Sequence, residues 1–247
     1  MDRFTSLRSL TLSRCSSDLV EQILNRIEKC ILEKISISYC KRGNNGRYSL
    51  TEQLLSYERY PSLRSINLKL CTRGIVYLTN IERKFETLKR LEYFSIDRPS
   101  LTEDLFNIIH HSPNLRSLNT VIINLHGSIL LSTELTKSFS LLRLKLISST
   151  IQISTLEYLI ENFPNLIYLY LDFSTSSSKL IYAQYWIDLF QKLNQLKHVY
   201  IRMLIQLLET NLSQEQVRER RLLSKRPWIF TRNLINRMNT IRIVINK

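Results

Sequence analysis

Four cysteines carry the most distinctive side-chain chemistry of this chain: Cys15, Cys30, Cys40 and Cys71. Two thiols could form a disulfide, and thiolates beside histidines could hold zinc. Neither a CxxC motif nor a histidine at zinc-ligand spacing accompanies any of the four. Reduced, buried thiols that pack as small apolar groups are the favoured interpretation, and a disulfide or a metal site is the alternative.

Catalytic motifs are absent from the sequence. It contains no GxSxG, HExxH or GxxxxGK[ST] pattern, and its four glycines form no phosphate-binding loop. His110 and His111 end an expected helix, where a cation is favourable, and His126 and His198 are isolated. We therefore expect no enzyme activity, no catalytic residue, no cofactor, no metal and no small-molecule substrate.

The composition is that of a globular protein with a basic surface. Hydrophobic residues make up 44% of 247 residues, and 35 Lys and Arg stand against 21 Asp and Glu, a formal charge of +14. Such a charge attracts nucleic acid, anionic lipid or an acidic protein without choosing among them. No apolar run is long enough to span a membrane, and the first residues do not resemble a signal peptide. We expect a cytoplasmic or nuclear protein.

A repeated pattern predicts the elements that position these residues. "SLRSLTL" at 6–12, "SLRSINL" at 62–68 and "NLIYLYL" at 165–171 share apolar residues at matching positions. The repeats begin at Leu7, Leu32, Leu63, Leu91, Leu115, Leu141, Leu166 and Leu196, with a weak ninth copy at Met238. The first seven spacings run from 24 to 31 residues, which scatter about the leucine-rich-repeat period of roughly 20–29.

The segments between these strands have the periodicity of helices. Residues 16–30, 49–62, 100–114 and 154–165 combine a capping residue with apolar residues on one face, and Pro ends the helix in three of them. In 16–30 the residues expected on the apolar face are Leu19, Ile23, Leu24 and Ile27. The sequence therefore predicts an α/β leucine-rich-repeat solenoid of horseshoe form, with a parallel sheet on its concave face and helices on its convex face. We expect repeats over 1–205 and a basic capping segment over 206–247.

The cysteines occupy fixed places in this repeat. Cys15, Cys40 and Cys71 are each the ninth residue counted from a starting leucine, a position that Asn or Cys takes in leucine-rich repeats. Cys30 lies two residues before Leu32, where other repeats carry Pro.

"LRSLTLSRC" at 7–15, "LEKISISYC" at 32–40 and "LRSINLKLC" at 63–71 resemble the cysteine-containing repeats of F-box/leucine-rich-repeat proteins. In that family an F-box docks on a ubiquitin ligase adaptor and the repeats recognise the substrate. The resemblance implies a substrate-recognition role within a ubiquitin ligase receptor. It covers residues 1 to about 205 and includes no F-box, since the first repeat begins within ten residues of Met1.

Side chains that alternate with the apolar strand residues would face the concave wall. In the early repeats they are small hydroxyls and amides, and in the later ones they are aromatic and cationic. Tyr and Arg are enriched in binding hot spots, whereas strands favour Tyr for packing alone. The predicted partner-binding residues are Arg143, Lys145, Tyr168, Tyr170, Asp172, His198, Tyr200 and Arg202. The expected partner is a protein of unknown identity.

Nucleic acid is the alternative partner. Residues 197–247 hold 11 Lys and Arg against 3 acidic residues, and the run at 218–232 is the densest part. Trp228 and Phe230 in that run would offer stacking surface beside phosphate-binding cations. A solvated charged helix at about 213–224, with Glu215 and Glu219 paired to nearby arginines, is the plainer interpretation.

Overall fold

The strands begin at a constant place in the eight clear repeats. In the computed structural model each of the eight clear repeats starts its strand two residues after its first leucine, at Ser9, Lys34, Ser65, Tyr93, Ser117, Arg143, Tyr168 and His198. The structure describes residues 6–27, 31–40, 54, 60–70, 89–100, 102–123, 138–175, 180, 183–205, 231–235 and 238–246. The expected α/β chain with parallel strands and intervening helices is confirmed at that level.

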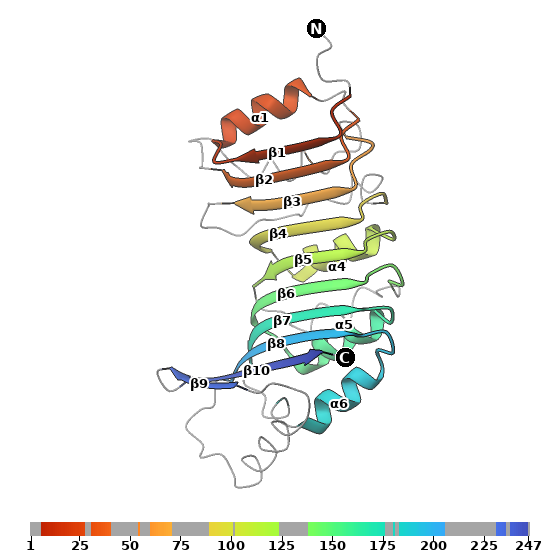
Figure 1. The fold of residues 1–247 in the computed structure, drawn as a ribbon, viewed down its shortest axis with the longest axis vertical. Coiled ribbons are helices and arrows are strands. Elements are labelled where there is room, and N and C mark those ends of the chain that lie inside the picture. Colours follow the sequence, from red (N-terminus) through yellow and green to blue (C-terminus); the bar gives the residue numbers. More distant parts are fainter. Residues whose placement is uncertain are drawn as a thin grey trace. The chain divides into compact units, whose positions relative to one another are not determined.

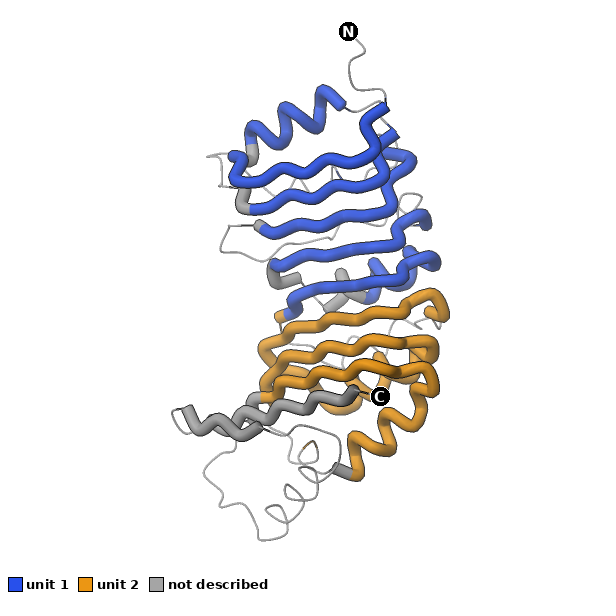
Figure 2. The backbone as a smooth tube through the Cα atoms, in the orientation of Figure 1, with its two compact units in different colours: residues 1–122 blue, residues 123–247 orange. Residues whose placement is uncertain are grey.

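Residues 1–122 form the first of two units, here called unit 1 (Figure 2). Its described strands are β1 (Ser9–Ser13), β2 (Lys34–Cys40), β3 (Ser65–Leu70), β4 (Tyr93–Ser100) and β5 (Ser117–Ile122). They lie side by side in chain order and pair in parallel (Figure 1). The described helices are α1 (Ser17–Arg26), which follows β1, and α4 (Thr102–His111), which follows β4 and lies beside β5.

Residues 123–247 form unit 2. Its parallel strands are β6 (Arg143–Thr150), β7 (Tyr168–Thr175) and β8 (His198–Ile205), and its described helices are α5 (Ile153–Asn162) and α6 (Ala183–Gln191). A hairpin follows, formed by β9 (Thr231–Ile235) and β10 (Met238–Asn246). Strand β10 pairs with β8 in the antiparallel direction (Figure 1).

The same turn precedes the strand in four repeats. The N–H of Leu63, Leu115, Leu166 and Leu196 donates to the carbonyl three residues earlier, at distances from 3.0 to 3.2 Å. Pro61, Pro113 and Pro164 stand at the second position of this turn, where the fixed φ of Pro is favoured. The predicted repeat position of Pro therefore has a backbone reason.

One backbone contact also recurs from strand to strand inside each unit. The residue after the starting leucine offers its carbonyl to two consecutive N–H groups of the next repeat, at 2.8–3.1 Å. Arg8 accepts in this way from Glu33 and Lys34, and Leu142 accepts from Ile167 and Tyr168. Because the contact is made by the backbone, it holds the parallel register whatever side chain the position carries.

Alternating burial separates the two faces of the strands. In β7 the side chains of Leu169, Leu171 and Phe173 are at most 2% exposed, while those between them are half-buried. The buried members join helix residues in the core of their own unit, such as Leu156, Leu159 and Ile160 of α5 in unit 2. The other face of the strands carries the side chains predicted to lie on the concave wall.

The helix signals were partly right. Ser16 caps α1 by accepting from the N–H of Leu19, as its residue type suggests. Leu19, which the apolar pattern placed on the inner face, is 45% exposed instead, and Val20 is fully buried in its place. The cause is that the cap starts the helix at Ser17 and so sets which of the adjacent apolar residues turns inward.

The weak ninth copy of the repeat pattern is a closing strand rather than a further parallel repeat. Strand β10 begins at Met238, but it runs antiparallel to β8, and β9 precedes it as a hairpin partner. Apolar alternation has a period of two in either strand direction, so the pattern at Met238 could not distinguish a further parallel repeat from a closing hairpin.

Of the cysteines, Cys15 alone has a described side chain. Its thiol is free, half-buried rather than buried, and directed at the carbonyl oxygen of Ser13 at 3.5 Å. Its Arg14 neighbour has a φ of 58°, which turns the chain out of β1. Cys40 ends β2, while Cys30 and Cys71 lie outside the described residues, as do most of the helix expected at 49–62 and the helix expected at 213–224.

Among the helices that the structure describes, none combines the length and the apolar character that a membrane crossing requires.

Candidate binding face on strands β6 to β8

The eight predicted binding residues all lie on one face of unit 2. We call this the unit 2 face, and it consists of the outward residues of β6, β7 and β8: Arg143, Lys145, Ile147, Ser149, Tyr168, Tyr170, Asp172, Ser174, His198, Tyr200 and Arg202. Parallel register arranges them in rows across the strands. Neighbouring strands are about 4.8 Å apart, so residues of one row are within reach of each other.

The central row is made of Lys145, Tyr170 and Tyr200. The rings of Tyr170 and Tyr200 stack with centroids 4.6 Å apart and an angle of 9° between their planes. The Nζ of Lys145 lies 5.1 Å from the centroid of the Tyr170 ring. A cation over a tyrosine ring is attracted by the ring's negative face, which fixes the position of the ammonium group.

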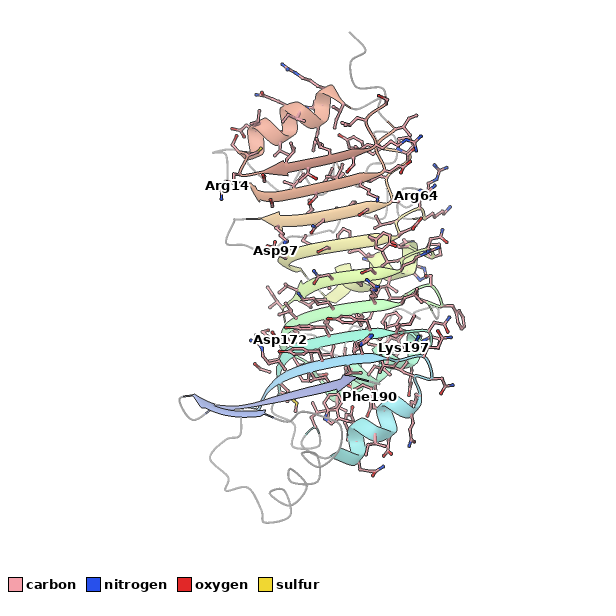
Figure 3. The ribbon with its side chains drawn as sticks, viewed as in Figure 1. Arg14, Arg64, Asp97, Asp172, Phe190 and Lys197 are labelled. Atoms are coloured by element: carbon pink, nitrogen blue, oxygen red, sulfur yellow. The ribbon has the colours of Figure 1, made fainter. Side chains whose placement is uncertain are left out.

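The next row toward the carboxyl ends, which consists of Ile147, Asp172 and Arg202, contains an ion pair. Arg202 Nε donates to Asp172 Oδ1 at 2.8 Å, and Arg202 Nη2 lies 2.5 Å from Asp172 Oδ2. The Asp172 side chain is 14% exposed and that of Arg202 is 56% exposed. Figure 3 labels Asp172 toward the carboxyl end of β7. The two-point contact occupies both carboxylate oxygens and orients the guanidinium plane.

The row nearest the amino ends contains Arg143, Tyr168 and His198. Arg143 and His198 are exposed and Tyr168 is half-buried. Among the residues that the structure describes, no carboxylate pairs with Arg143 or with Lys145 of the central row. No described carboxylate therefore compensates their positive charge.

Two groups on the face have shifted pKa values. Burial raises the pKa of Tyr170, and the Asp172 carboxylate and Tyr200 add to that effect. The hydrogen bond that Arg202 donates to Asp172 raises the pKa of Arg202. At neutral pH the Tyr170 hydroxyl is thus a proton donor and Arg202 is charged.

Strand β10 borders the face through its pairing with β8. Arg242 takes the register position opposite Arg202, Val244 the position opposite Tyr200, and Asn246 the position opposite His198. The register of β10 with β8 thus continues the sheet by one backbone position in each row.

The corresponding face of unit 1 has different chemistry. Its outward residues are mostly Ser and Asn, and they hydrogen-bond from strand to strand: Asn67 Nδ2 to Ser36 Oγ at 3.3 Å, and Asn119 Nδ2 to Ser95 Oγ at 2.9 Å. Asn67 Oδ1, by contrast, is buried without a described partner. Tyr93 is the aromatic member and is 44% exposed.

Sequence analysis predicted which residues share the unit 2 face but missed which of them touch. The signal was present, because Lys145, Tyr170 and Tyr200 are each four residues after a starting leucine. Asp172 and Arg202 are each six residues after one. Equal repeat positions become neighbours in parallel register, so aligning the repeats would have paired them. That these residues bind a partner stays a prediction.

No cluster of His, Cys, Asp and Glu suited to a metal ion occurs in the part of the chain that the structure describes. The basic run at 218–232 lies outside the described residues except for its last two, Thr231 and Arg232, in β9.

Comparison with known proteins found no matching family model, no matching curated protein and no matching solved structure.

Proposed function

We propose that this chain is a non-enzymatic protein-binding module of the leucine-rich-repeat type and that its partner lies on the unit 2 face. The observation that carries the proposal is the central row, in which Lys145, Tyr170 and Tyr200 form one continuous stack across three strands. Tyrosines offer large, rigid contact area at low entropic cost and a hydroxyl as a polar handle.

The leucine-rich-repeat assignment is supported by the 24–31-residue spacing and by the turn and backbone contact that recur in the repeats. In such an array the outward residues are free to vary, since the buried residues and the backbone hold the fold. This freedom suits a face whose side chains are selected for a ligand.

The family resemblance extends the proposal to a process. If the repeats act as those of F-box/leucine-rich-repeat proteins do, the partner on the unit 2 face is a substrate delivered for ubiquitin transfer. A partner whose cellular abundance rises when the chain is depleted would support this extension.

The test is capture by the full chain carrying a photo-crosslinking residue at position 168, compared with the same residue at position 65 on unit 1. We expect a defined protein to be crosslinked from position 168 and not from position 65. The variant Tyr170→Ala with Tyr200→Ala should reduce this product severalfold, whereas Tyr93→Ala, the matched exposed tyrosine of unit 1, should not. Equal products from both positions, or no effect of the double variant, would contradict the proposal.

Both tyrosines are half-buried, so the double variant needs a check on folding. Its circular dichroism spectrum and thermal transition should show a folded protein at the capture temperature. A folded variant that still gives the full product removes the central row from the site.

A further inference from the structure

The unit 2 face has an excess of positive charge with a definite location. Of its three permanent cations, Arg202 is taken by Asp172, the only carboxylate on the described face. Arg143 and Lys145 remain on β6 without a carboxylate from any described residue. The attractive charge is therefore concentrated along one strand rather than spread over the face.

Lys145 is also oriented in advance. Its Nζ lies 5.1 Å from the Tyr170 ring centroid, and Tyr170 is braced from its other side by Tyr200 at 4.6 Å. A lysine that is already held loses less side-chain freedom when it binds an anion than a free surface lysine does. The aromatic stack thus makes Lys145 a better anchor for a carboxylate.

The same stack argues against bases of nucleic acid as the ligand here. A base stacks on a free ring face. One face of the Tyr170 ring is covered by Tyr200, and Lys145 lies over the ring as well. The raised pKa of Tyr170 keeps its hydroxyl protonated, so that it can donate to a carboxylate or a backbone carbonyl.

The spacing of the two cations defines the form of the ligand. Arg143 and Lys145 are two residues apart on β6, so their Cα atoms are about 6.6 Å apart at a strand rise of about 3.3 Å per residue, and their side chains leave the same face of the strand. Side chains at alternate positions of an extended peptide have the same separation and point to the same side. Adjacent acidic residues in an extended peptide point to opposite sides.

From this match we infer that the partner presents an extended acidic segment, with Asp or Glu at alternate positions, and that its two carboxylates pair with Arg143 and Lys145 while it runs along β6. This inference rests on the proposed binding function of the unit 2 face. Arg202 contacts both oxygens of Asp172, the one described carboxylate of the face, so Asp172 does not compete with the partner for Arg143 and Lys145.

The test measures binding of three fluorescent peptides to the full chain by fluorescence anisotropy. The first, Gly-Glu-Ser-Glu-Ser-Glu-Gly, has alternate glutamates. The second has Gln in place of each Glu, and the third, Gly-Glu-Glu-Ser-Ser-Glu-Gly, has the same composition as the first with two glutamates adjacent and none at alternate positions. We expect the alternating peptide to bind at least about tenfold more tightly than the Gln peptide and severalfold more tightly than the adjacent one.

Charge removal provides the matched control. The double variant Arg143→Gln with Lys145→Gln should bind the alternating peptide about tenfold or more weakly than the unmodified chain does. Lys34→Gln with Lys69→Gln removes the same charge from two exposed lysines on the outward face of unit 1 and should change binding less than about twofold. The weakening of alternating-peptide binding between 20 mM and 300 mM salt should be larger with Arg143 and Lys145 present than in their double variant.

Each other outcome overturns the inference. Equal binding of the Gln peptide, or equal losses in the two double variants, would show that the location of the charge is irrelevant. A single-stranded oligonucleotide that binds more tightly than the alternating peptide and is lost in the Arg143 and Lys145 variant would assign the face to nucleic acid. If crosslinking at position 168 succeeds while the peptides fail to discriminate, the proposed function stands and the acidic partner is refuted.

Discussion

The outward strand faces of the two units share a backbone plan and differ in how their polar side chains are satisfied. On unit 1, Asn119 donates to Ser95 and Asn67 donates to Ser36, and the ion pairs Arg8–Glu33 and Arg64–Glu92 lie at the amino ends of the strands. On unit 2, Arg143 and Lys145 have no described carboxylate partner, and the amino-end positions include the apolar Leu142 and Ile167.

The difference indicates that the paired polar groups of unit 1 serve stability, whereas the cations of unit 2 that lack a described carboxylate partner are available for recognition. A polar group that already pairs with its neighbour gains little from a ligand, because binding must first replace that pair. A cation without a partner can gain a new one. On strands held by the same backbone contacts, two Asn–Ser pairs thus link the outward side chains of unit 1, whereas unit 2 places two cations without a described carboxylate partner at alternate positions of one strand.

The largest effect should be the same in both units, because the inner faces are alike. Leu68 in β3 and Leu171 in β7 occupy the same repeat position and are both 0% exposed. We expect Leu68→Ala and Leu171→Ala each to lower the free energy of unfolding by about 2–5 kcal/mol, from lost burial and the remaining cavity. Urea denaturation followed by circular dichroism measures both.

This prediction limits the comparison to the outward faces. We expect the two losses of unfolding free energy to agree within the error of extrapolating to zero urea. A larger difference would show that the cores of the two units differ too, and the contrast would not be confined to the outward faces. Separate transitions for the two units would allow each variant to be assigned to its own unit.

A smaller effect distinguishes the ion pairs. Arg202 contacts both oxygens of a well-buried Asp172, whereas Arg64 reaches one oxygen of Glu92 at 3.3 Å and is 62% exposed. A double-mutant cycle with Arg202→Gln and Asp172→Asn should give a coupling energy of about 1 kcal/mol, reduced by the exposure of Arg202. The cycle with Arg64→Gln and Glu92→Gln should give below about 0.5 kcal/mol.

Both cycles are read from urea denaturation at pH 7 in low and in moderate salt. The Arg64 coupling should diminish with salt more than the Arg202 coupling, since exposed charges are screened more. Equal coupling energies would mean that the second contact on unit 2 contributes nothing, and Asp172 would then have no special role on that face.

The repeat pattern predicted the scaffold well because strand geometry is local. A leucine two residues before each strand and apolar residues at alternate positions are enough to define where β2 or β7 starts and which side of it is buried. The direction of β10 was not encoded in this way, because it depends on a hairpin and on pairing with β8.

The binding face was predicted as a set of residues but not as a set of contacts. The stack of Tyr170 on Tyr200 joins residues 30 apart, and it follows from register rather than from local sequence. The Arg202–Asp172 pair has the same origin. Exposure of Leu19 was missed for the opposite reason, since a single cap at Ser16 decides it locally.

The smallest predicted effect concerns alkaline pH. The pKa of Tyr170 is raised above its usual value of 10.0, mainly by burial, so the unfolded chain releases this proton at a lower pH than the folded one. The unfolded state therefore binds fewer protons above pH 10, and folding stability contributed by Tyr170 is present below that pH and lost as pH rises.

Tyr170→Phe should lose less stability than the unmodified chain between pH 9 and pH 11, measured by urea denaturation at both values. The difference between the two chains isolates Tyr170 from other groups that titrate there. Identical losses would show that the Tyr170 hydroxyl is solvated as in an open surface, and the central row would then be less closely packed than its 4.6 Å stacking distance implies.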